Sequence, residues 1–161
     1  MADDGFEFPV DRTQVMLFAR AVRDISPVYS DPDHNDTKAQ GGIIVPPTFV
    51  QSSAHWQPNY PLDLTRPRPA GEEPARHRGD GGGGGLARGL HAEQRYEYHH
   101  PVHAGDTLRV TTRPGERWER EGRRGGKLTF SESITEYRNQ NGVLCVTATS
   151  VGVQTERAVE Q

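Results

Sequence analysis

The sequence lacks what several common classes of protein need. With only one cysteine, Cys145, the chain cannot form an internal disulfide, and no apolar run approaches the roughly 18 residues of a membrane-spanning helix. The net charge is only −3 and both signs are mixed along the chain, so nothing resembles a basic stripe for nucleic acid or a polybasic membrane patch. The N-terminal MADDGFEFPV does not resemble a signal peptide. We therefore expect a cytoplasmic protein without a membrane span.

The spacings of a metal site or a phosphate-binding loop are also missing. His91, His99, His100 and His103 fall within one segment, but no His-x-His pair, HExxH motif or cysteine partner accompanies them. On a regular strand, His99 and His100 would point to opposite faces. The glycine run at 81–85 has neither the strand-to-helix context nor the Lys-Ser/Thr of a P-loop. The sequence therefore predicts no metal and no cofactor.

The chain has the length of one domain and a composition poor in core residues. At 161 residues, 1–161 is expected to form a single domain with its own core. Only 32% of the residues are hydrophobic, and there are 18 glycines and 12 prolines. This composition favours a modest core with long irregular segments, and the longest of these is expected at about 57–89.

Two helices are predicted in the N-terminal third. The first begins after Asp11, a capping residue that has Gln14 three positions later, as in a capping box. We expect it to end at Ser26-Pro27, because the residue before a proline is pushed out of the helical region. Prolines are tolerated in the first turn of a helix, so the second helix is expected over 47–56.

The C-terminal part alternates as strands do. Asn141-Gly142 is a strong tight-turn signal between the last two of these segments. Helices followed by a meander of antiparallel strands predict an α+β fold. The predicted strands cover residues 91–100, 107–113, 127–137 and 143–153.

Four stretches carry a resemblance to a known family: ARAVRDISPVYSDP, GGIIVPPTF, LHAEQRYEYHHPVHAGDTL and GGKLTFSESITEYRNQNGVLCVTATS. In this order they resemble the MaoC-like dehydratase family, and most closely its N-terminal-domain branch with the mycobacterial HadA-type subunits. The resemblance implies a hot-dog fold, in which an antiparallel sheet wraps around a central helix and two such domains form a double hot-dog. It also implies thioester substrates, namely enoyl or 3-hydroxyacyl groups on CoA or acyl carrier protein.

The resemblance also carries a site. Active members have a G-D-x-N-P-x-H motif, whose Asp and His activate a water molecule, and a backbone N–H in a later H-G segment polarises the thioester carbonyl. Matched residue by residue, the Asp falls on Asp24, the Asn on Ser26, the Pro on Pro27 and the His on Tyr29. The H-G segment falls near Pro46-Pro47.

This chain departs from the family pattern at both chemical groups. Tyr29 has a phenol with an ordinary pKa of about 10, which makes it a poor base at neutral pH. Neither Pro46 nor Pro47 has a backbone N–H, so Thr48 is the nearest amide donor left. Pro47, Thr48 and Phe49 are the candidate substrate-binding residues.

Three hypotheses follow. The first is a lyase subunit: the non-catalytic, tunnel-forming partner of an (R)-specific enoyl-CoA hydratase/3-hydroxyacyl dehydratase, whose second MaoC-like chain supplies the Asp and His. The second is an autonomous homodimeric hydratase that recruits another base. The third is an acyl-CoA thioesterase or binding module that uses polar residues of the central helix. The alternative bases are His34, His99 and His100, and the helix residues are Gln51, Ser52 and Ser53.

Overall fold

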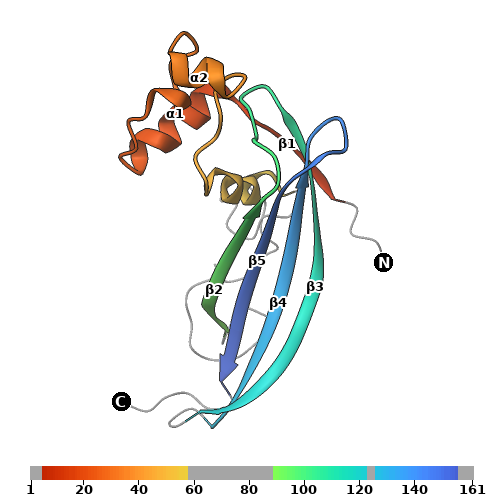
Figure 1. Ribbon diagram of the computed structural model, residues 1–161. Coiled ribbons are helices and arrows are strands. Elements are labelled where there is room, and N and C mark those ends of the chain that lie inside the picture. The colour runs from red at the N-terminus through yellow and green to blue at the C-terminus, as the bar shows by residue number, and fades with distance from the viewer. Residues whose placement is uncertain (1–4, 58–88, 123–125, 156–161) are drawn as a thin grey trace, which may run out of the picture. The chain divides into compact units, whose positions relative to one another are not determined.

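The computed structural model describes residues 5–57, 89–122 and 126–155. A five-stranded sheet is its largest element, with the strand order β1-β3-β4-β5-β2 (Figure 1). The strands are β1 (Phe6–Pro9), β2 (Gly89–Tyr98), β3 (Thr107–Gly122), β4 (Gly126–Arg138) and β5 (Leu144–Thr155). Consecutive β3, β4 and β5 are neighbours, which is the predicted meander. The predicted irregular segment 57–89 and its glycine run lie almost entirely outside the described residues.

The four predicted strands are present, but β3 is longer than its sequence pattern indicates. The alternation ends at Arg113 because Pro114 and Gly115 follow, and both residues usually interrupt a strand. Strand β1 pairs with β3 only as far as Val110. The later residues of β3 therefore form an edge of the described sheet, where the missing N–H of a proline is tolerated.

Strand β1 was not predicted, because its four residues are too few to show alternation. It pairs antiparallel with β3, placing Phe8 opposite Leu108. Both side chains are fully buried. Gly5, just before the strand, approaches β3 so closely that a Cβ atom would lie 2.5 Å from the carbonyl oxygen of Val110.

Helix α1 (Arg12–Ala21) begins as predicted and ends earlier. The Asp11 side chain accepts a hydrogen bond from the Gln14 N–H at 3.0 Å, which confirms the cap. The predicted end at Ser26-Pro27 is wrong. Arg23 adopts a left-handed conformation (φ 61°), and the N–H of Asp24 donates to the Ala19 carbonyl at 2.9 Å. This is a Schellman ending, here made by an arginine where glycine is usual.

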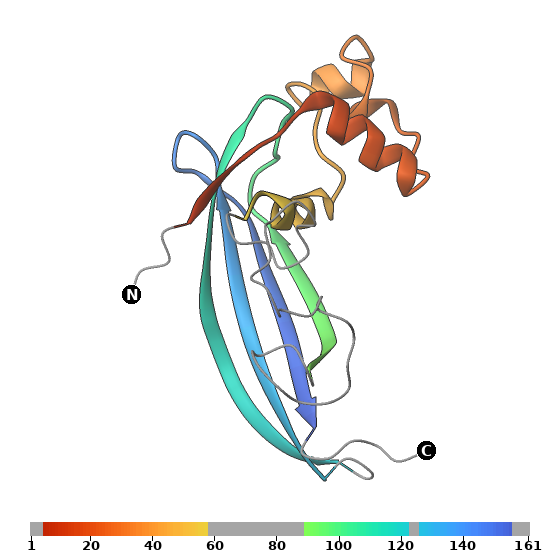
Figure 2. The same ribbon diagram turned by 180° about the vertical axis from the view of Figure 1, so that it is seen from behind.

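Two short helical turns follow that the sequence did not predict. They are η1 (Pro27–Tyr29), a single 3₁₀ turn, and α2 (Asn35–Ala39). Thr37 is fully buried, and its hydroxyl donates to the Pro27 carbonyl at 3.2 Å. This contact ties α2 to η1, and Figures 1 and 2 show α2 beside α1 from both sides.

The second predicted helix is η2 (Phe49–Trp56), which has 3₁₀ geometry. It begins two residues after the predicted start, because Pro47 and Thr48 form the turn that leads into it. Phe49 is 1% exposed. Its ring packs against Phe8 of β1 and Phe18 of α1, with centroid distances of 5.7 Å and 5.5 Å.

The described residues fall into two compact units. The first contains the helices and most of the buried apolar side chains, and comprises residues up to 58, 96–112 and 135–147. The second contains the remaining strand segments, with Trp118 stacked on Phe130 at 5.2 Å and ion pairs Lys127–Glu119 and Arg95–Glu132. Every residue of the candidate site lies in the first unit.

Candidate functional site

Asp24 lies in a turn that its own side chain helps to close. The N–H of Ser26 donates to Asp24 Oδ1 at 3.1 Å, and the N–H of Tyr29 donates to the Ser26 carbonyl at 3.3 Å. The carboxylate is exposed to solvent. Because these bonds are local, the turn is held within a few residues of the end of α1.

Tyr29 and Asp24 come together, as the family motif requires of its His and Asp. Tyr29 is 9% exposed. Burial, the negative charge of Asp24 and a hydrogen bond with the Asp24 side chain all raise the pKa of Tyr29 above its ordinary value of 10.0. The phenol is therefore protonated at neutral pH. It can donate a hydrogen bond to the carboxylate, but it cannot accept a proton from water.

His34, the first alternative base, serves as the cap of α2. Its Nδ1 accepts a hydrogen bond from the Asp36 N–H at 3.2 Å and lies 3.7 Å from the Asp36 carboxylate. Within residues 5–57, 89–122 and 126–155, no hydrogen bond or ion pair joins a histidine to Asp24. The structure thus gives His34 a local structural role.

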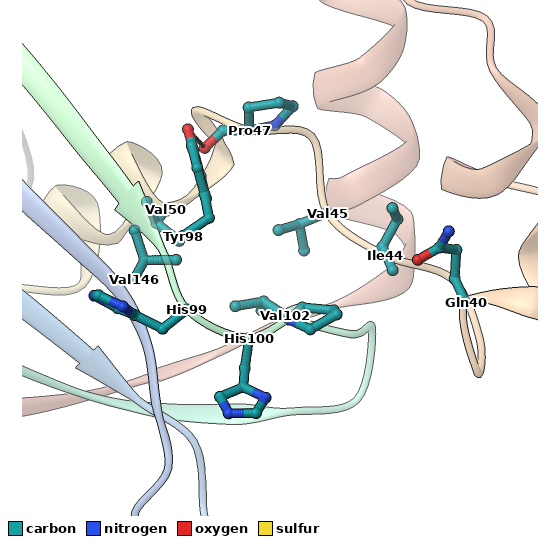
Figure 3. A pocket seen from close by; sticks show the side chains of 11 residues that line it. Gln40, Ile44, Val45, Pro47, Val50, Tyr98, His99, His100, Val102 and Val146 are labelled. Atoms are coloured by element: carbon teal, nitrogen blue, oxygen red, sulfur yellow. Dashed lines mark hydrogen bonds between the residues drawn. The ribbon is translucent and has the colours of Figure 1, made fainter.

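His99 and His100 lie where β2 ends against β5. Both backbone N–H groups donate to the carbonyl of Cys145, at 2.8 Å and 3.2 Å, so two residues face one as in a β-bulge. The His99 ring pairs with the Thr147 hydroxyl at 3.0 Å. Both histidines line one pocket, and Figure 3 shows their rings pointing in different directions.

The Pro46-Pro47 segment is fixed by its carbonyl groups. The Pro46 carbonyl accepts from the Phe49 N–H at 2.9 Å, and the Pro47 carbonyl accepts from the Tyr98 hydroxyl, also at 2.9 Å. In a trans peptide, the C=O and the following N–H point in opposite directions. The Thr48 N–H therefore points away from the Tyr98 hydroxyl.

The candidate substrate-binding residues have different surroundings. Pro47 lines the pocket, Thr48 is exposed, and Phe49 is buried among other aromatic rings. Phe49 thus anchors η2 in the core, while Pro47 is the member of the three that can face a ligand in this pocket.

The pocket has a volume of about 310 Å³ and a mainly apolar lining. The N–H of Ile44, one of its lining residues, donates to the Val28 carbonyl of η1 at 3.2 Å, whereas Asp24 and Tyr29 do not line it. The apolar lining residues are Ile44, Val45, Pro47, Val50, Pro101, Val102 and Val146, and the others are Gln40, Tyr98, His99 and His100.

The polar residues of η2 are engaged in structural hydrogen bonds. Gln51 accepts from the Tyr96 hydroxyl at 3.2 Å, and the Ser52 hydroxyl donates to the Phe49 carbonyl at 2.7 Å. Ser53 is 3% exposed and pairs with Tyr137 at 3.3 Å. This arrangement pairs neither serine hydroxyl with a histidine or carboxylate that could activate it as a thioesterase nucleophile.

Sequence reasoning did not single out Tyr98 or the valines of the pocket. The signal for Tyr98 was its alternation with Tyr96 on a predicted strand, which places both rings on one face. In the described part of the chain, no three His, Cys, Asp or Glu side chains are grouped as metal ligands. None of the described helices is long and apolar enough to cross a membrane.

A family model described as "FAS1-like, dehydratase domain region" matches residues 2–149. The chain belongs to this family. Among curated relatives, a UPF0336 protein of Streptomyces avermitilis is 30% identical to this chain over 105 residues. The match covers 65% of this chain and 60% of that protein. A UPF0336 protein of Streptomyces griseus is 33% identical with the same coverage. The chain thus spans about 60% of the length of these curated relatives.

Solved structures show the fold. The HadBC (3R-hydroxyacyl-ACP dehydratase) complex of Mycobacterium tuberculosis contains a chain with 22% identity and a TM-score of 0.63, with 94% of this chain and 93% of that chain covered. A MaoC-like dehydratase gives 19% identity and a TM-score of 0.66, with 96% and 41% covered. A chain of the ChsH1-ChsH2 complex of M. tuberculosis gives 19% identity and a TM-score of 0.54, with 97% of this chain and 98% of that chain covered.

These similarities confirm two predictions. The chain has the α+β hot-dog fold, and its resemblance to the MaoC-like dehydratases is confirmed. The finer similarity to HadA-type subunits stays a prediction.

Proposed function

We propose that this chain is a subunit of an (R)-specific enoyl-thioester hydratase/dehydratase, and that a second hot-dog chain supplies the catalytic Asp and His. Its substrate is an acyl-CoA or acyl-carrier-protein thioester. The observation that carries the proposal is the pair of Asp24 and Tyr29. A buried, protonated phenol bonded to Asp24 occupies the position that the motif matching assigns to the family's histidine base.

The donor segment supports the same proposal. A hydratase needs a hydrogen-bond donor at the thioester oxygen, where negative charge develops in the transition state. Pro46 and Pro47 have no N–H, and the Thr48 N–H points away from Tyr98, which lines the pocket. Both chemical groups of the half-site are therefore altered together, and a complete half-site has to come from another chain.

Heteromeric assembly is also favoured by the similar structures. Two of them, HadBC and ChsH1-ChsH2, are described as complexes of differently named chains. In such an assembly, a half-site without a base can still raise turnover, because binding energy from remote parts of the substrate is used at the reacting centre. The present chain would contribute the pocket beside η2.

Activity of the purified chain tests the proposal. Alone, it should not hydrate crotonyl-CoA or longer enoyl-CoAs. Hydration is measured as loss of the enoyl-thioester absorbance. Co-purified with a second MaoC-like chain that carries an intact G-D-x-N-P-x-H motif, it should be active. Activity of the complex should be lost on replacing the partner chain's motif aspartate by asparagine, and kept in Asp24→Asn. Robust activity of the lone chain that Asp24→Asn abolishes would refute the proposal.

A further inference from the structure

The body of the pocket is suited to an aliphatic group. Five of its side chains are β-branched and apolar, so their χ1 angles are stiff and the walls are well defined. Figure 3 labels Val45 and Val102 among these side chains, and the N–H of Val45 donates to the Val102 carbonyl at 3.0 Å. Its volume of about 310 Å³ lies at the lower end of the range for ligand pockets, about 300–1,000 Å³. A pocket of this size limits the length of chain that fits.

One side of the pocket is a tyrosine ring fixed at two places. The Tyr98 hydroxyl donates to the Pro47 carbonyl at 2.9 Å, so the ring spans from the end of β2 to the turn before η2 (Figure 3). Its face stacks on Tyr96 with centroids 6.1 Å apart and an interplanar angle of 19°. Tyr96 is itself bonded to Gln51 of η2 at 3.2 Å. A ring with these contacts does not swing aside easily.

We propose that the ring of Tyr98 sets the longest acyl group that the pocket accepts, which makes Tyr98 a specificity-determining residue. The acyl class of the ligand rests on the proposed function, whereas the fixed ring rests on the contacts above. Tyr98 is 54% exposed and also lines the pocket, so part of the side chain meets solvent and part of it forms the pocket wall. Removing the ring opens this side of the pocket and lets a longer chain pass.

The proposal predicts a length profile for binding. Each methylene that finds apolar room strengthens binding about fourfold. In the wild-type chain, affinity should rise from butyryl-CoA upward, reach a maximum, and then fall where the acyl chain meets Tyr98. In Tyr98→Ala, the fall beyond the maximum should disappear, and the affinity for dodecanoyl-CoA relative to the wild-type optimum should improve about tenfold. Shorter chains should bind a few-fold more weakly, because the contacts with the ring are lost.

The experiment is isothermal titration of the purified chain with saturated acyl-CoAs from butyryl- to dodecanoyl-CoA. Tyr96→Phe is the matched control. It removes a phenol from the same strand and breaks the bond to Gln51, but it leaves the ring that supports Tyr98, and Tyr96 does not line the pocket. Its length profile should match the wild type. Should Tyr98→Ala fail to fold, Tyr98→Leu removes the ring with a smaller loss of apolar volume and gives the same readout.

The outcomes separate this inference from the proposed function. Identical length profiles for wild type and Tyr98→Ala overturn the inference, and so does an affinity that does not depend on chain length. Absence of binding at every length, by the lone chain and by its co-purified complex, overturns it too. The proposed function fails on a different result, hydratase activity of the lone chain.

Discussion

The two halves of the proposed half-site depart from the family's motif in different ways. The acid–base half keeps the aspartate: Asp24 is held by the Ser26 N–H and paired with Tyr29, while Ser26 and Tyr29 stand in place of the motif's Asn and His. The donor half departs in its backbone, because the predicted donor segment falls near Pro46 and Pro47, which have no N–H, and the Tyr98 hydroxyl holds the carbonyl of Pro47. The first half therefore departs from the motif in its side chains, whereas the second departs in its main-chain donors.

The halves also differ in what holds them. The acid–base half depends on local hydrogen bonds at the end of α1, whereas the donor half depends on Phe49, which is buried against Phe8 and Phe18. Four experiments test whether the two halves differ in this way.

The largest effect is expected from Phe49→Ala. Removing a ring that is 1% exposed and packs against two others should lower the free energy of unfolding by about 3–5 kcal/mol, measured by urea denaturation. Thr48→Ala is the control on the adjacent, exposed residue and should change the free energy of unfolding by less than about 0.5 kcal/mol. If Phe49→Ala lowers the free energy of unfolding no more than Tyr29→Phe does, the donor half depends on its buried contacts no more than the acid–base half does.

The next effect concerns catalysis. Tyr29→His restores a base beside Asp24, and Pro47→Gly restores a backbone N–H after Pro46. A positioned base contributes about 100-fold or more to such reactions, and one oxyanion donor a similar factor. Each single variant of the lone chain should therefore stay close to background with crotonyl-CoA. The double variant should exceed either one about tenfold or more, because each group needs the other.

In this experiment, Pro47→Ala in the Tyr29→His background separates the effect of the restored N–H on activity from the effect of glycine's backbone flexibility. It also restores the amide, so it should share the gain if the donor matters. Full activity in Tyr29→His alone would mean that the donor half is intact.

A smaller effect is expected from Tyr29→Phe. It removes the hydroxyl that is bonded to Asp24 and keeps the buried ring. Since the Asp24 carboxylate is exposed and can be rehydrated, the loss in unfolding free energy should be only about 1 kcal/mol. Asp24→Asn keeps an acceptor for the Ser26 N–H and should cost less. A loss near zero for Tyr29→Phe would show that the pair is not formed in solution.

The smallest effect is confined to alkaline pH. The folded pKa of Tyr29 is raised above its usual 10.0, so its contribution to stability is complete below that pH and is lost as pH rises through the folded value. As the pH rises above 10, the free energy of unfolding of Tyr29→Phe should therefore fall less steeply than that of the wild type. The difference in slope should be at most about 1.4 kcal/mol per pH unit. Urea denaturation at several pH values measures the difference. Parallel curves would contradict the raised pKa.

Local signals in the sequence predicted much of the fold. The cap at Asp11 and the tight turn at Asn141-Gly142 depend on neighbouring residues, and the structure contains both, whereas η2 begins two residues later than predicted. Strand β1 and the late part of β3 were missed, because pairing between distant segments decides them. The end of α1 was misplaced, since a left-handed arginine gives no signal in composition.

The site was predictable where it follows a motif. The motif placed Asp24 and Tyr29 five residues apart and two prolines at the donor segment, and the assignment of these residues to a site stays a prediction. Tyr98 was not expected, because its contact with Pro47 joins residues 51 positions apart. The pocket between such segments depends on packing, which a single sequence does not display.

The left-handed Arg23 has a consequence for how this turn can change over time. A non-glycine residue in this conformation costs about 1 kcal/mol, so the chain reverses there only because the Schellman bonds and the Asp24–Ser26 bond outweigh that cost. Asp24 therefore contributes to folding as well as to any reaction. A side chain at position 24 that cannot accept the Ser26 N–H should therefore loosen this turn even where no reaction takes place at it.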